Sequence, residues 1–113
     1  MNKRVFGSKG EDLACEYLIQ NGYEILERNK HFSKFCEIDI IAKYKSKIVF
    51  VEVKTRRSDA FGSPLEAITK TKYNNIKTGV ISYINDHNIK DYRVDVIGIT
   101  LNPELKINHL KNI

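Results

Sequence analysis

Cysteine is scarce in this chain of 113 residues, which contains only Cys15 and Cys36. The two lie in separate predicted elements, without a CxxC spacing and without a nearby histidine cluster. This pattern is typical of reduced, unligated side chains in a cytosolic protein rather than of a disulfide framework or a zinc site. We therefore expect a cytoplasmic location.

Long apolar runs and linkers are also lacking. No run approaches the roughly 18 residues that a membrane-spanning helix needs. The N-terminal segment MNKRVFGSKG lacks the hydrophobic region of a signal peptide. No internal repeat or low-complexity segment divides the chain. We expect one globular domain over residues 1–113, long enough to bury its own core, with no membrane partner.

Acidic residues are fewer than basic ones, 14 against 19, which gives a net charge of +5 and a pI near 9.2. The hydrophobic content of 42% and the charged content of 29% are those of a globular protein. A basic protein suits a polyanionic partner such as DNA, but a lysine-rich surface also serves solubility. Charge alone leaves both explanations open.

The most informative stretch is residues 36–57, CEIDIIAKYKSKIVFVEVKTRR. Ile38 to Ala42 and Ile48 to Val53 are rich in the β-branched residues that favour strands, and Lys43 to Lys47 contains no long apolar run. The pattern predicts a β-hairpin with its turn at Lys45 and Ser46.

That turn fixes which residues of the hairpin lie opposite each other. Side chains directly opposite in an antiparallel pair share a face, and residues two apart on one strand share it too. Asp39, Glu52 and Lys54 are therefore predicted to meet on one face. The predicted pairs are Tyr44 with Lys47, Ala42 with Val49, Ile40 with Val51, Asp39 with Glu52, and Glu37 with Lys54.

Two opposed carboxylates weaken a sheet unless a cation neutralises them. Mg²⁺ takes oxygen ligands, commonly one or two carboxylates with waters and phosphate oxygens, so Asp39 and Glu52 are candidate ligands. The alternative is that Glu37 and Lys54 form an ordinary cross-strand ion pair and that a slipped register separates Asp39 from Glu52.

A helix is predicted over residues 10–21, before the hairpin. Ser8 and Glu11 have the spacing of a capping box, and Gly22 is placed to end the helix in a left-handed conformation. Glu11 either caps this helix or points toward the hairpin carboxylates, and both roles stay open. A strand follows from Tyr23 to Arg28.

Two basic segments are predicted as solvated loops, with contact to DNA phosphates as the alternative. They are Arg28 to Lys34, which contains His31 and Phe32, and Thr55 to Gly62, which contains Arg56 and Arg57.

A short helical start is predicted at Ser63, Pro64 and Glu66, and a longer amphipathic helix runs from a cap at Thr69 to about Asp86. Its apolar face is formed by Tyr73, Ile76, Val80, Ile81 and Ile84, and its early polar part carries Lys70, Lys72 and Lys77.

A strand from Tyr92 to Leu101 follows, in which we expect Asp95 to have a structural role beside Arg93, and an edge strand from Leu105 to His109 closes the chain. The order helix, three strands, helix, one or two strands predicts an α/β fold with a central mixed sheet and a helix against each face.

The site residues support a family comparison. Asp39, twelve intervening residues and then Glu52, Val53 and Lys54, after a helix that bears Glu11, resemble the PD-(D/E)XK nuclease superfamily, also called restriction-endonuclease-like. The segments GSKGEDLACEYLIQNGYEILERN, EIDIIA, FVEVKTRRSDAFGSP and RVDVIGI are similar to the YraN family of small bacterial proteins, which is related to Holliday junction resolvases. One departure is Cys36, where that family usually has glycine.

The resemblance implies a catalytic site of Glu11, Asp39, Glu52 and Lys54. Asp39 and Glu52 would hold Mg²⁺ or Mn²⁺, Glu11 would contribute from the first helix, and Lys54 would orient or help deprotonate the attacking water. Hydrolysis by similar nucleases leaves a 5′-phosphate and a 3′-hydroxyl.

The expected function is a Mg²⁺- or Mn²⁺-dependent endonuclease that hydrolyses phosphodiester bonds of branched or damaged DNA, selecting DNA structure rather than sequence. One alternative is a module that binds DNA or a partner and keeps the nuclease fold without turnover. A third hypothesis is a homodimer that completes the site. DNA contacts are expected from Arg56, Arg57, Lys70 and Lys72.

Overall fold

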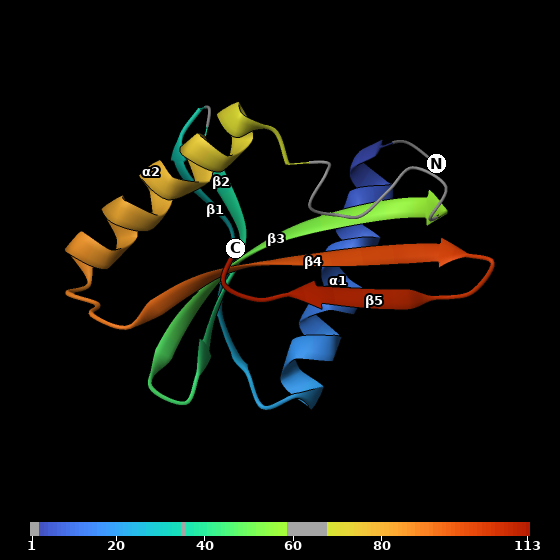
Figure 1. Ribbon diagram of the computed structural model, residues 1–113, viewed down its shortest axis with the longest axis horizontal. Helices are drawn as coiled ribbons and strands as arrows, with labels where there is room; N and C mark the ends of the chain where they lie inside the picture. The colour runs from blue at the N-terminus through green and yellow to red at the C-terminus, as the bar shows by residue number, and fades with distance from the viewer. Residues whose placement is uncertain (1–2, 35, 59–67) are drawn as a thin grey trace.

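The computed structural model describes residues 3–34, 36–58 and 68–113. The elements follow the predicted order, with the fifth strand present (Figure 1). Within these ranges, no helix is long and apolar enough to cross a membrane. The elements are α1 (Lys3–Gln20), β1 (Glu24–Ser33), β2 (Cys36–Tyr44), β3 (Lys47–Ser58), α2 (Lys70–Asp86), β4 (Tyr92–Asn102) and β5 (Lys106–Leu110).

The strands form one mixed sheet in the order β1-β2-β3-β4-β5. β3 and β4 are parallel, and the other neighbours are antiparallel. A parallel pair needs a crossover connection, and α2 lies within the segment that supplies it. The predicted mixed sheet is confirmed.

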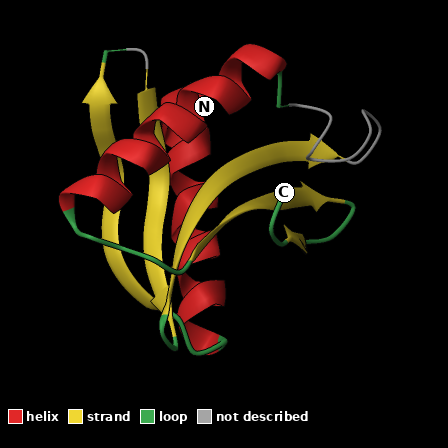
Figure 2. Cartoon of the chain, turned by 60° about the vertical axis from the view of Figure 1, so that its left-hand side comes forward, coloured by secondary structure: helices red, strands yellow, loops and turns green. Residues whose placement is uncertain are grey.

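The two helices cover opposite faces of the sheet (Figures 1 and 2). Leu18 of α1 packs in a buried cluster with Val51 and Ile97. On the other face, Ile76 of α2 packs with Phe50. Two apolar layers therefore hold β3, the strand that carries Glu52 and Lys54, from both sides.

Helix α1 begins at Lys3, earlier than the predicted start at residue 10, so Ser8 lies inside the helix and does not cap it. The capping-box prediction is wrong. Gly10 fits inside the helix because α1 passes very close to β3: a Cβ at Gly10 would lie 1.7 Å from Thr55 Oγ1. The predicted end is confirmed, since Gly22 has φ +91 and stops the helix in a left-handed conformation.

The predicted hairpin is confirmed as far as its ladder extends. The turn falls at Lys45 and Ser46, and the ladder runs from Tyr44 opposite Lys47 to Ile40 opposite Val51. Beyond Val51 the ladder ends, and the strands part (Figure 2). The predicted continuation to Asp39 opposite Glu52 and Glu37 opposite Lys54 is therefore not part of the ladder.

Both predicted basic loops begin inside strands. β1 continues to Ser33 because its backbone pairs with β2, for example Lys30 with Ile38, and backbone pairing does not require apolar side chains on an edge strand. β3 continues to Ser58, so Arg56 and Arg57 are strand residues. The rest of the second loop and the helical start predicted at Ser63, Pro64 and Glu66 lie outside the described residues.

Helix α2 has the predicted cap, because Thr69 Oγ1 accepts a hydrogen bond from the Lys72 amide at 3.1 Å. Its buried face differs at one position: Ile81 is 52% exposed, and Tyr83 is buried in its place. Gly79 lets the helix lie close to β1 and β2, since a Cβ there would lie 2.9 Å from Cys36 Sγ and from Phe32.

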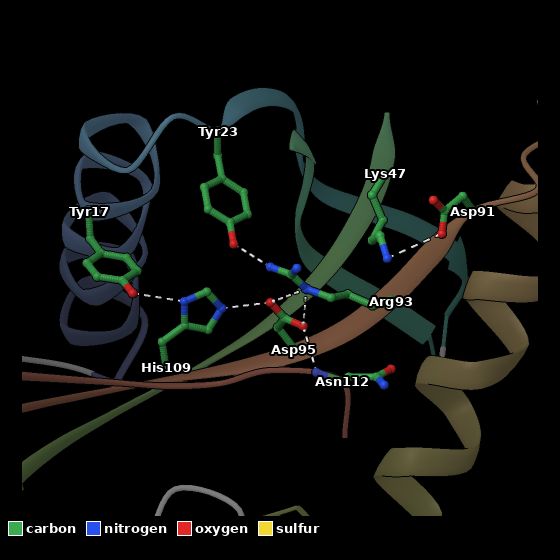
Figure 3. Close-up of polar contacts among 8 residues, drawn as sticks. All are labelled: Tyr17, Tyr23, Lys47, Asp91, Arg93, Asp95, His109 and Asn112. Carbon is green, nitrogen blue, oxygen red and sulfur yellow. Dashed lines mark hydrogen bonds and ion pairs between the residues drawn. The ribbon is translucent and has the colours of Figure 1, made fainter. Parts of the chain in front are cut away.

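Asp95 is fully buried at the centre of a polar network that joins β4, β5 and α1 (Figure 3). Arg93 Nε donates to Asp95 Oδ1 at 3.0 Å, and His109 Nε2 lies 2.6 Å from Oδ2. The Tyr17 hydroxyl lies 2.9 Å from His109 Nδ1, and Arg93 also donates to Tyr23. The structural role predicted for Asp95 is confirmed.

Candidate active site

Asp39 lies where β2 leaves the ladder. Its Oδ2 accepts a hydrogen bond from the Val53 amide at 2.8 Å, so a side chain takes the place of the next backbone partner. This bond ties Asp39 to the backbone next to Glu52. The two residues come together, as the sequence predicts, although the contact is made beyond the ladder.

Glu52 points from β3 toward the N-terminal turn of α2. Its side chain is only 4% exposed, and its Oε1 lies 3.2 Å from Lys72 Nζ. Its Oε2 is buried with no hydrogen-bond partner in the described part of the chain. A buried carboxylate oxygen without a partner is costly, and a bound cation or a hydrogen-bond donor would satisfy it.

The electrostatics of the pair follow from burial. Burial, with a further contribution from the Asp39 charge, raises the pKa of Glu52 from its ordinary 4.5 to about 7, against the opposing effect of Lys72 and Lys54. Burial also raises the pKa of Asp39, although the Val53 amide and Lys72 oppose it. Two carboxylates at this spot resist being charged together.

Glu11 approaches the same carboxylates from α1. Its side chain is 16% exposed, and its Oε1 lies 3.7 Å from Arg28 Nη2, too far for a hydrogen bond. Burial and then the Asp39 charge raise the pKa of Glu11, while Asn29 and Arg28 lower it. Glu11 therefore lies between the basic Arg28 of β1 and the Asp39 carboxylate, and a part in the site stays a prediction.

Lys54 is the next residue on the Glu52 side of β3, and its charge lowers the pKa of Glu52. Glu37, the partner proposed for Lys54 in the alternative, instead has its carboxylate 3.6 Å from His31 Nε2. The structure thus brings Glu11, Asp39, Glu52 and Lys54 into one electrostatic neighbourhood at the end of the hairpin ladder.

The donor set fits a hard divalent cation with few protein ligands. Across residues 3–34, 36–58 and 68–113, no group of three or more His, Cys, Asp or Glu is arranged to hold a metal ion. Mg²⁺ commonly uses only one or two carboxylates and keeps several waters, and carboxylate oxygens also suit Mn²⁺. Asp39 and the unsatisfied Oε2 of Glu52 match that requirement.

The basic residues predicted to meet DNA lie on β3 and at the start of α2. Nε and Nη1 of Arg56 are buried without a hydrogen-bond partner among the described residues. Arg57 and Lys70 are exposed. Lys72 differs from the others because it pairs with Glu52 inside the candidate site. Sequence alone could not reveal this contact, since the rotation of α2 on the sheet decides which lysine faces Glu52.

Two cavities of the described part of the chain lie away from these carboxylates. One of about 300 Å³ is lined by Tyr73, Lys77, Tyr92 and neighbouring residues of α2, β4 and the C-terminal segment. Another of about 380 Å³ lies beside it and shares Tyr73. Asp39, Glu52 and Lys54 line neither. The candidate site is instead where β2 and β3 part beyond the end of their ladder.

Comparisons with known proteins agree with this fold. A model described as "Uncharacterised protein family UPF0102" matches residues 10–99. A UPF0102 protein of Caldanaerobacter subterraneus is 48% identical and covers 99% of this chain and 96% of its own length. A UPF0102 protein of Clostridium botulinum is 49% identical, with coverages of 94% and 90%.

Among solved structures, the Holliday junction resolvase Hjc of Archaeoglobus fulgidus is similar with a TM-score of 0.59 and 16% identity, over 89% of this chain and 72% of that one. This similarity confirms the predicted restriction-endonuclease-like fold and extends no further than the fold. With the family match over residues 10–99 and relatives nearly half identical over most of their length, the chain belongs to the UPF0102 family, also called YraN.

Proposed function

We propose that this protein is a metal-dependent DNA endonuclease that acts on branched DNA. The observation that carries the proposal is the convergence of the buried Glu52 with the partly buried Asp39, two carboxylates that resist simultaneous charging, with one oxygen of Glu52 unsatisfied. Such a pair destabilises a sheet that has only a structural role, whereas a bound cation would be stabilised by both carboxylates. The resolvase fold of Hjc and the net charge of +5 support DNA as the partner.

Each residue of the site has a distinct part in the hydrolysis. Asp39 and Glu52 would hold Mg²⁺ or Mn²⁺, and Glu11 would add negative charge from α1. The cation supplies Lewis acidity at the scissile phosphate and lowers the pKa of a water. Lys54 orients the attacking water and offsets the charge that develops on the phosphate. Water attacks phosphorus, the bond to the 3′ oxygen breaks, and a 5′-phosphate and a 3′-hydroxyl result.

Arg56 would contact the DNA backbone close to the reaction. It lies on β3 two residues beyond Lys54, so its side chain is on the same side of the strand as Glu52 and Lys54. A planar guanidinium suits a phosphate group, which can accept two parallel hydrogen bonds. Arg57 and Lys70 would extend this contact along the duplex, so recognition would depend on backbone shape.

The test is cleavage of a four-way junction, a flap and a linear duplex with Mg²⁺ or Mn²⁺. We expect cleavage of the branched substrates by the natural sequence and a loss of at least about 100-fold in Asp39→Asn, as a lost electrostatic contribution to catalysis implies. Glu16→Gln, an exposed change on the outer side of α1, serves as the control. Equal background cleavage by the natural sequence and Asp39→Asn on all three substrates would contradict the proposal.

A second candidate is a DNA- or partner-binding module with the same fold and no turnover. The observation that favours it is that the described residues contain no preformed group of three metal-ligating side chains. This candidate predicts salt-sensitive DNA binding that is unchanged in Glu52→Ala, together with no metal-dependent cleavage. Absence of binding at low salt would rule it out.

A further inference from the structure

Lys72 brings a positive charge from α2 onto the hairpin carboxylates. Its Nζ lies 3.2 Å from Glu52 Oε1, and the Glu52 side chain is 4% exposed. The carboxylate end of this ion pair is shielded from water, whereas the ammonium end is partly exposed. The lysine is held as an ammonium ion beside Glu52.

This ammonium compensates only part of the negative charge around it. It contacts Oε1, while Oε2 of the same carboxylate remains without a hydrogen-bond partner among the described residues. Asp39 adds a second carboxylate next to Glu52. Lys72 forms the ion pair with Glu52, whereas Lys54 acts on it only through its charge. A divalent cation could bind oxygens of both carboxylates at once.

The Lys72 side chain can leave Glu52 without disturbing the helix. It is 40% exposed, and it stands in the first turn of α2, after the Thr69 cap. The helix is anchored by other residues, since Ile76, Val80 and Tyr83 are buried against the sheet. A lysine stem is flexible enough to carry its ammonium between two nearby anions.

We propose that Lys72 is the resident counter-ion of Glu52, that it competes with a divalent cation for this carboxylate, and that its release lets it bind a phosphate group of the DNA. The inference rests on the proposed function and deepens it. Lys72 thereby couples two events: its ammonium stays on Glu52 until a cation binds the carboxylates, and only then does it become available to a phosphate group of the substrate.

The first experiment measures Mn²⁺ binding without DNA, by the electron paramagnetic resonance signal of unbound Mn²⁺, with every variant in the same buffer at the same pH. Lys72→Gln keeps a hydrogen-bond donor for Glu52 and removes the charge. We expect it to bind Mn²⁺ about tenfold more tightly, as removal of a competing charge-assisted hydrogen bond implies. Lys72→Arg keeps the charge and should bind as the natural sequence does.

Lys77→Gln is the matched control, because it makes the same change in net charge on an exposed residue of the same helix. We expect it to change Mn²⁺ affinity less than about twofold, since an exposed charge more than a helical turn away is screened. An unchanged or weaker affinity in Lys72→Gln would overturn the inference and would show that Lys72 only anchors α2. Absence of Mn²⁺ binding by the natural sequence and all variants would overturn the proposed function as well.

The second experiment tests the release toward phosphate by binding a four-way junction in EDTA and in Ca²⁺. With EDTA, Lys72 stays on Glu52, so Lys72→Gln should leave DNA affinity within about twofold of the natural sequence. With Ca²⁺, the released ammonium contributes, and Lys72→Gln should weaken binding severalfold, roughly the worth of one phosphate contact. If Lys72→Gln weakened DNA binding equally in EDTA and in Ca²⁺, or in neither, the proposed coupling between cation binding and release of Lys72 would be overturned.

Discussion

Glu52 is the residue at which stability and the proposed chemistry conflict. Its side chain is 4% exposed, and burial raises its pKa from 4.5 to about 7. A carboxyl group whose pKa is higher in the folded protein binds its proton more tightly there than in the unfolded chain. The stabilisation that comes from protonated Glu52 is complete below about pH 4.5, the ordinary pKa of this group. It is lost as the pH rises through about 7, its pKa in the folded protein.

Glu52→Gln should therefore stabilise the protein, and by an amount that depends on pH. We expect the free energy of unfolding to rise by roughly 2–3 kcal/mol at pH 8 and by much less at pH 4.5, because each pKa unit corresponds to about 1.4 kcal/mol. Urea denaturation at the two pH values measures this difference. Glu37→Gln, on the half-exposed neighbour of Asp39, is the control. The same gain at both pH values would show that ionisation of Glu52 is not the cause.

At the scale of elements, Asp95 connects β4 to β5 and α1 through a network of hydrogen bonds. It accepts hydrogen bonds from Arg93 and from the Asn112 amide, and it contacts His109 of β5, which contacts Tyr17 of α1 (Figure 3). Burial alone would raise the pKa of Asp95, but His109, the Asn112 amide and Arg93 together lower it below 3.8. The stability that Asp95 contributes is present above about pH 3.8 and is lost as the pH falls through its lowered pKa.

Asp95→Asn should cost about 3–5 kcal/mol of unfolding free energy at pH 7, because it leaves the charge of Arg93 buried without its partner. Asp91→Asn is the matched control, since Asp91 pairs with Lys47 at 3.4 Å but its side chain is 56% exposed (Figure 3). That change should cost no more than about 1 kcal/mol. Urea denaturation compares the two, and hydrogen exchange should show faster opening of β5 in Asp95→Asn only. Equal costs would contradict the role given to Asp95.

The hairpin could be predicted in detail because its signals are local. Side-chain alternation and a turn between two β-branched runs fix the register as far as Ile40 opposite Val51. The start of α1 could not be predicted, because a serine and a glutamate at capping-box spacing also occur inside helices. The close approach of Gly10 to Thr55 is a tertiary contact, which the local sequence does not reveal. The predicted site comprised Glu11 and three hairpin residues, Asp39, Glu52 and Lys54, while the contact of Lys72 with Glu52 depends on how α2 docks.

At the scale of the whole molecule, the question is whether DNA binding reflects net charge or the placement of charge. The chain carries +5, and any loss of one positive charge reduces it equally. If the DNA backbone runs along β3 past the candidate site, Arg56 should contribute more to DNA affinity than a lysine at the turn end of the hairpin. Lys43, exposed at that turn end, provides the comparison.

Arg56→Gln should weaken binding to a four-way junction and lower the steepness of its salt dependence by about one unit, as loss of one phosphate contact implies. Lys43→Gln removes the same charge and should change the slope by much less. Fluorescence anisotropy in EDTA, over roughly 50 to 200 mM salt, measures both. Equal slopes for the two variants would mean that the protein attracts DNA through its overall charge. A smaller slope in Arg56→Gln alone would locate the DNA backbone beside Lys54, where the proposed hydrolysis requires it.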